Sequence, residues 1–154
     1  MVEMSVQGIT LDPITNMPVV VLKSKDSNDV LPLWIGVFEA NAIASILENI
    51  QRPRPMTHDL MKNIFDTLKA NVKYVYISDI VGDVYYAKIV VNSNGDEYLI
   101  DARPSDAINL ALRCNVPIYA SEGVLERIKK ELDSQLNEEE LEEWLEAIKP
   151  EDFS

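Results

Sequence analysis

The sequence has one cysteine and one histidine among 154 residues, and each scarcity excludes a class of site. A single cysteine, Cys114, excludes an intrachain disulfide and a zinc site built on several cysteines. Because Cys114 falls in a helical stretch, we expect a buried, unreactive thiol rather than a reactive one. The single histidine, His58, is the only imidazole that could act as an acid or base.

Long apolar runs and cofactor motifs are also missing. No run of about 18 apolar residues occurs, so we expect no membrane span. Residues 1–12 do not pair a basic segment with an apolar core, so we expect no signal peptide and a cytoplasmic location. The sequence has no glycine-rich phosphate loop and no nucleophile elbow, and we expect no organic cofactor.

Basic residues are scarce as well: 14 Lys and Arg stand against 26 Asp and Glu, which gives a net charge of −12. Residues 122–154 hold 12 acidic and 4 basic side chains, so this end of the chain is the more acidic. Avid binding of nucleic acid normally uses a basic face. Any nucleic-acid chemistry must therefore use a local basic patch, a bound cation, or both.

The spacing of apolar residues predicts an α+β domain with a mostly antiparallel sheet, helices packed on it and a C-terminal helical pair. We assign residues 1–135 to the main domain and 136–154 to an acidic helical extension packed on it. Thr57 is the expected N-cap of the second helix, and Pro32 suggests an edge strand. Strands are expected at 2–6, 17–22, 30–35, 74–80, 84–91, 97–102 and 117–120, and helices at 39–50, 57–68, 104–113, 121–132 and from 137 on.

A weak internal repeat is visible at an offset of 65 residues, where residues 41–43 match residues 106–108. Each copy would be three strands followed by a helix. The alternative is that any two strand–helix junctions look alike. If the repeat is real, Glu39 in one copy and residues 101–106 in the other come to comparable places.

The segment 101–106, Asp-Ala-Arg-Pro-Ser-Asp, spans the end of a strand and the first turn of a helix. Asp101 and Asp106 could share a divalent cation, while Arg103 clamps a phosphate with Ser105 beside it. The alternative is structural, because an aspartate in the first turn stabilises the helix dipole and can form a simple salt bridge.

The segment 52–59, Arg-Pro-Arg-Pro-Met-Thr-His-Asp, is the second candidate. Its prolines hold Arg54 in an extended connector where it could meet a phosphate backbone. His58 and Asp59 follow at the start of a helix. In the alternative interpretation these two residues cap the helix, and the arginine stems cover apolar surface.

Three of these segments, in this order and spacing, resemble the bifunctional nuclease domain family. They are Leu33-Trp34-Ile35-Gly36 with Glu39-Ala40, then residues 54–60, then residues 101–108. The resemblance covers about residues 1–135 and implies an enzyme that degrades DNA and RNA. It strengthens the functional interpretation of both candidate segments without fixing the role of any residue.

Two functions from different classes follow. In the first, the chain is a metal-assisted phosphodiesterase: Asp101 and Asp106, with Glu39 or Asp59, hold Mg²⁺ or Mn²⁺, and His58 transfers a proton. Arg54 and Arg103 hold the phosphate. In the second, the same motifs are caps and ion pairs of a non-catalytic binding or assembly module.

The sheet surface predicts self-association. The apolar residues 19–22, Trp34 and residues 85–86 give more sheet surface than a few short helices cover, and unpaired strand edges invite symmetric pairing. We therefore expect a homo-oligomer, most simply a dimer. Residues 137–154 are expected to be peripheral to any site, because their charge repels phosphate.

Overall fold

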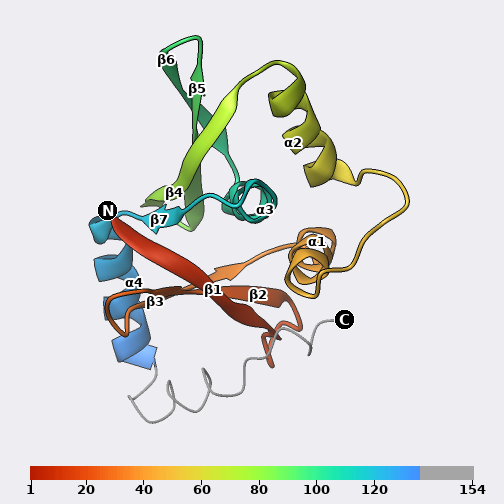
Figure 1. The fold of residues 1–154 in the computed structure, drawn as a ribbon. Helices are drawn as coiled ribbons and strands as arrows, with labels where there is room; N and C mark the ends of the chain where they lie inside the picture. The colour runs from red at the N-terminus through yellow and green to blue at the C-terminus, as the bar shows by residue number, and fades with distance from the viewer. Residues whose placement is uncertain (136–154) are drawn as a thin grey trace.

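The computed structural model describes residues 1–135, and it forms one seven-stranded sheet with four helices (Figure 1). The extension assigned to residues 136–154, with its expected helix from residue 137, lies outside the described residues. The elements are β1 (Val2–Leu11), β2 (Pro18–Ser24), β3 (Val30–Trp34), α1 (Val37–Leu47), α2 (Thr57–Thr67), β4 (Asn71–Val81), β5 (Val84–Ser93), β6 (Asp96–Ala102), α3 (Pro104–Cys114), β7 (Ile118–Ala120) and α4 (Glu122–Gln135).

The sheet consists of two antiparallel meanders joined by a short strand. Its order is β3-β2-β1-β7-β4-β5-β6, in which β7 pairs antiparallel with β1 and parallel with β4. All other pairs are antiparallel, which confirms the mostly antiparallel α+β prediction. The strand with Pro32 is an edge strand, as expected, because proline has no backbone N–H to donate to a ladder and is tolerated where that position needs no partner strand.

The duplicated unit is visible in the element order, since β1-β2-β3-α1 is followed by β4-β5-β6-α3 with α2 between the copies. The predicted offset of 65 residues is wrong by two, because α1 begins at Val37 and α3 at Pro104. At the structural offset the buried alanines Ala40 and Ala44 of α1 correspond to Ala107 and Ala111 of α3.

The helices lie on both sides of the strongly twisted sheet (Figure 1). Helices α1 and α3 pack against each other, α1 also contacts β2, and α3 also contacts β4 and β5. Helix α4 contacts β3 and β4. A second small cluster, Val19, Val21 and Val30 with Leu132 of α4, buries the other face of β2 and β3. Both faces of this half of the sheet are therefore covered.

The other half of the sheet is far less covered. All of β6 except its last residue is exposed, including Tyr98, Leu99 and Ile100. Helix α2 buries only His58. Within the described residues no helix is long and apolar enough to cross a bilayer.

Two local predictions can be compared directly with the fold. Thr57 is not the N-cap of α2: the cap is Met56, whose N–H donates to Asp59 Oδ2 at 3.0 Å. Cys114 is partly buried, and burial raises the pKa of its thiol, as expected for an unreactive cysteine.

Candidate functional site

An open pocket of about 720 Å³ lies where α1, the connector that follows it, and the first turns of α2 and α3 meet. Its ionic wall comes from three helices that are far apart in the sequence. It comprises Glu39 of α1, His58 and Asp59 of α2, and Asp106 and Arg113 of α3, with Arg103 just before α3. The pairing of α1 with α3 thus brings the two strand–helix junctions together.

Arg103 joins the two junctions. Its Nη2 donates to Glu39 Oε1 and its Nε donates to Asp106 Oδ2, each at 2.9 Å. Glu39 and Asp106 occupy the same position of their helices, three residues after the N-caps Gly36 and Arg103. These carboxylates raise the pKa of Arg103, Asp106 more strongly than Glu39, so the guanidinium stays charged. The Arg103 side chain is nevertheless 65% exposed, which leaves it accessible from the pocket.

The absence of a side chain at Gly36 leaves room for the Glu39 carboxylate. A Cβ at residue 36 would collide with Glu39 Oε2. The glycine is therefore explained by a close approach of this side chain, since the backbone of residue 36 is in an extended conformation that any residue adopts. A side chain at this position would push Glu39 away from Arg103.

His58 is the other partner of Asp106. Its Nε2 lies 2.9 Å from Asp106 Oδ1, so one carboxylate holds both the imidazole and the guanidinium. The His58 side chain is only 7% exposed. No described residue forms a hydrogen bond with Nδ1. Within residues 1–135, however, every side-chain nitrogen or oxygen that is fully buried from solvent has a hydrogen-bond partner. Nδ1 therefore keeps some contact with solvent.

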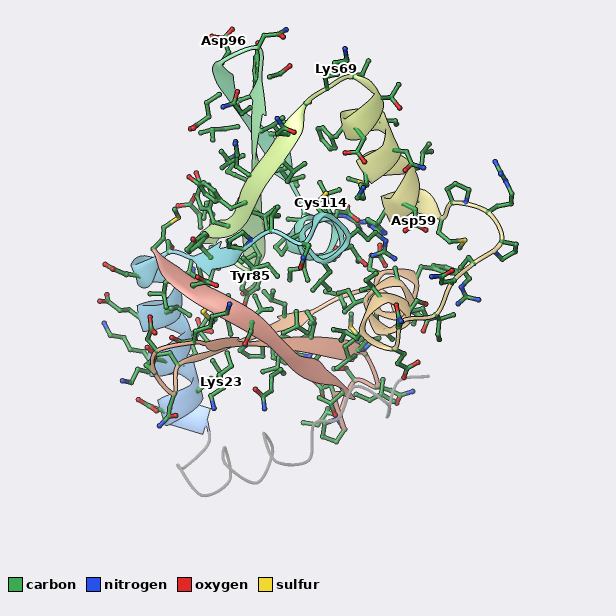
Figure 2. All side chains as sticks on the ribbon, viewed as in Figure 1. Lys23, Asp59, Lys69, Tyr85, Asp96 and Cys114 are labelled. Atoms are coloured by element: carbon green, nitrogen blue, oxygen red, sulfur yellow. The ribbon has the colours of Figure 1, made fainter. Side chains whose placement is uncertain are left out.

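Asp59 and Arg113 form a second ion pair, separate from that of Arg103 with Glu39 and Asp106. Arg113 Nε donates to Asp59 Oδ1 at 2.8 Å, and its other nitrogens donate to Asn109 and to the Ala42 carbonyl. The Arg113 side chain is almost fully buried, and it ties α2, α3 and α1 together. In Figure 2 Asp59 lies at the start of α2, on the side that faces α3. Arg113 is thus a positioning residue for this wall.

Both aspartates of the wall are held ionised. Burial alone would raise the pKa of Asp106, but hydrogen bonds from Arg103 and His58 outweigh it, and its pKa lies below the usual value. The pKa of Asp59 is lowered in the same way: burial raises it, but hydrogen bonds from the Met56 N–H and from Arg113 lower it by more.

The structure brings together five of the eight residues that the sequence nominated: Glu39, His58, Asp59, Arg103 and Asp106. It does not bring the other three to the pocket. Asp101 is exposed in β6 and pairs with Lys88 of β5 at 3.1 Å. Ser105 is buried and does not line the pocket, and Arg54 is exposed outside it.

The expected metal set of Asp101, Asp106 and Glu39 does not assemble. Within residues 1–135 no group of three or more His, Cys, Asp or Glu side chains is placed to hold a metal ion. Glu39 and Asp106 do converge, but the Arg103 guanidinium already bridges them. The side chains as arranged do not fit a preformed cation site.

Among the residues that line or support the pocket, sequence reasoning did not nominate Phe38, Asn109 and Arg113. For two of them a signal was present. Asp106, Asn109 and Arg113 are spaced by three and four residues, which places them on one face of a helix. Arg52 lies in a nominated segment, and its Nη2 donates to Ser45 Oγ at 3.4 Å. Nothing in the sequence pointed to Phe38, because a single exposed aromatic residue forms no recognisable spacing pattern with other residues.

Comparison with known proteins identifies the family of the chain. Residues 20–133 match the family model described as the bifunctional nuclease domain. An uncharacterized protein of Mycobacterium tuberculosis (strain ATCC 25618 / H37Rv) is 35% identical over 162 residues, 98% of this chain and 97% of the relative.

Two plant relatives carry the family name. Bifunctional nuclease 1 of Oryza sativa subsp. japonica is 33% identical over 109 residues, and Bifunctional nuclease 2 of Arabidopsis thaliana is 30% identical over 119 residues. These matches cover 68% and 75% of this chain but only 33% and 36% of the plant proteins. The chain belongs to the bifunctional nuclease domain family.

Proposed function

We propose that the chain hydrolyses phosphodiester bonds of nucleic acid in the pocket between α1, α2 and α3. One observation carries the proposal: a buried imidazole and an exposed guanidinium share the Asp106 carboxylate on the wall of an open pocket. The plant relatives, which are named bifunctional nucleases, support the reaction class.

Arg103 is the proposed phosphate ligand. Two of its nitrogens are held by Glu39 and Asp106, and its Nη1 makes no hydrogen bond within the described residues. A guanidinium fixed in this way presents a positive charge at a set place, and it can donate to a phosphate oxygen without first being ordered. This local charge lets an acidic protein accept a phosphate without a basic face.

His58 is the proposed general base. When Nε2–H donates to Asp106, Nδ1 carries the lone pair and can take a proton from an attacking water. The water oxygen forms a bond to phosphorus, the bond from phosphorus to the sugar oxygen breaks, and the departing oxygen takes a proton from solvent. Asp106 orients the imidazole and stabilises the positive charge that develops on it.

The divalent cation expected from the sequence stays a prediction. The described carboxylates form no group of three that could hold a metal ion, and Arg103 bridges the two that converge. Mg²⁺ often binds through one or two carboxylates together with substrate phosphates. A cation that used both Glu39 and Asp106 in place of Arg103 would need Arg103 to leave them.

The partners and location expected from the sequence also remain proposals. Nucleic acid is the proposed substrate, and a second copy of the chain is the proposed protein partner. The exposed apolar strand β6, which lies at the free edge of the sheet, supports self-association. The lone, partly buried Cys114 is compatible with the reducing conditions of a cytoplasmic location.

The test compares cleavage of labelled single-stranded RNA and DNA by purified wild type, Arg103→Ala and Arg103→Lys. We expect both substitutions to slow cleavage, because lysine keeps the charge but cannot bond two carboxylates in the planar geometry of arginine. Arg54→Ala, outside the pocket, is the control and should cleave like wild type. Absence of cleavage by wild type would favour the non-catalytic module instead.

A further inference from the structure

The pocket has a second wall that plays no part in the hydrolysis described above. It comes from α1 and the connector that follows it, where the apolar side chains Phe38, Ala42, Ile46, Ile50 and Met56 line the pocket among polar ones such as Ser45 and Arg52. Three of its side chains are well exposed, with Ile50 and Met56 about half exposed and Phe38 87% exposed. Apolar side chains gathered on one side of an open pocket are a place where an apolar ligand surface can bind.

Phe38 is the most prominent of these residues. It is the second residue of α1 and directly precedes Glu39, whose carboxylate holds Arg103. The side of α1 that faces the core is occupied by Ala40, Ile43 and Ala44, so Phe38 contributes nothing to that core. An aromatic ring held by a helix and left almost fully exposed beside a charged site fits a role in binding.

We propose that this apolar wall is a nucleobase subsite and that Phe38 is its stacking platform. The inference rests on the proposed function. A nucleotide has a flat base at one end and a phosphate at the other, and both the exposed Arg103 and these aromatic and aliphatic side chains line the same pocket. Stacking on an aromatic side chain accepts every base, because each has a π-face.

The subsite predicts a substrate with accessible bases. In a duplex each base is covered on both faces by its neighbours, so Phe38 can stack only on an unpaired or terminal base. The depth of His58 adds to this preference, because a side chain 7% exposed can reach only a phosphate that enters the pocket. Single-stranded nucleic acid is therefore the substrate class assigned to this pocket.

The experiment measures binding of a short labelled single-stranded oligonucleotide by fluorescence anisotropy. Phe38→Ala should weaken binding by roughly 5- to 100-fold, the usual range for one lost stacking contact. Phe38→Trp should restore it. Val37→Ala is the matched control, because Val37 is adjacent and 56% exposed but does not line the pocket, and it should bind like wild type. An oligonucleotide of abasic sites should bind wild type and Phe38→Ala equally.

Two results would overturn the subsite: equal binding of the base-containing oligonucleotide by wild type and Phe38→Ala, or an equal loss on the abasic strand. The second would show a change of the protein surface rather than lost stacking. Cleavage measured on the same preparations separates the two proposals. Cleavage that needs His58 but ignores Phe38 refutes the subsite alone, whereas binding that needs Phe38 without any cleavage refutes the hydrolysis alone.

Discussion

His58 and Asp106, 48 residues apart in the sequence, meet with Nε2 and Oδ1 at 2.9 Å. Asp106 lies in the first turn of α3, after the strand–helix junction of the second repeat, and His58 lies in the first turn of α2, the helix between the repeats. Asp106 is also held by Arg103, which reaches Glu39 of the first repeat. The fold thus places one imidazole, one guanidinium and two carboxylates on a single pocket wall.

Arg113 is expected to contribute to the free energy of unfolding by holding this wall together. Arg113→Ala removes the arginine partner of Asp59 and the arginine hydrogen bonds to the carbonyls of Asn109 and Ala42, which lie inside α3 and α1. We expect a loss of roughly 2 kcal/mol in the free energy of unfolding, less than for a fully buried pair, because Asp59 is 39% exposed. Urea denaturation measures this loss. Arg103→Ala, at an exposed ion pair, should cost less than about 1 kcal/mol, and an equal loss for both variants would contradict the assignment.

Acid should destabilise the wall through Asp106. Its pKa is lower in the folded chain than in the unfolded chain, so its contribution is complete above the unfolded value of about 3.9 and is lost as the pH falls through the folded pKa. Urea unfolding from about pH 6 to about pH 2 should therefore show wild type losing more stability than Asp106→Asn in the acid range. Parallel pH curves for the two proteins would show that Asp106 gains nothing from Arg103 and His58.

Chelation tests the role of a metal. The proposed phosphate ligand is the Arg103 side chain, so we expect purified protein treated with EDTA to retain cleavage. Single-turnover rates before and after dialysis, with Mg²⁺ and Mn²⁺ added back separately, give the answer. Complete loss in EDTA with recovery in Mg²⁺ or Mn²⁺ would show that Glu39 and Asp106 release Arg103 to bind a cation.

Self-association should depend on β6. Leu99 is 58% exposed on this edge strand, and a charge there should disfavour an apolar contact between two copies. We expect light scattering to give about twice the monomer mass for wild type and the monomer mass for Leu99→Lys. Ile14→Lys, at a turn residue 92% exposed, is the control and should not change the mass. A wild-type mass of 17.4 kDa across micromolar concentrations would contradict self-association.

Much of this arrangement follows from local patterns, and the failures have physical causes. Proline positions indicate where helices begin, and the alternation of apolar and polar residues indicates where strands end. From these patterns Glu39, His58 and Asp106 were expected near one another. Asp101 was expected with them but still belongs to the ladder of β6, where it lies opposite Lys88. Strand alternation, and not the following helix, sets its direction.

The predicted repeat offset of 65 residues also failed for a physical reason. Matching letters aligned Asn41 with Asp106, whereas the helix starts at Val37 and Pro104 align the small buried residues Ala40 and Ala107. Contact between helices is determined by which face is small and buried, and a sequence comparison does not weigh that. The ion pair of Asp59 with Arg113 was missed because it joins residues 54 positions apart.

Cleavage of a single-stranded oligonucleotide by wild type, His58→Ala and Asp101→Asn tests the account most directly. His58→Ala should lower the single-turnover rate by roughly 10²-fold or more, because a general base is lost. Asp101→Asn should leave the rate close to that of wild type, because Asp101 lies outside the pocket. A full rate for His58→Ala, or a loss with Asp101→Asn in a protein that remains folded, would contradict the active site assigned to this pocket.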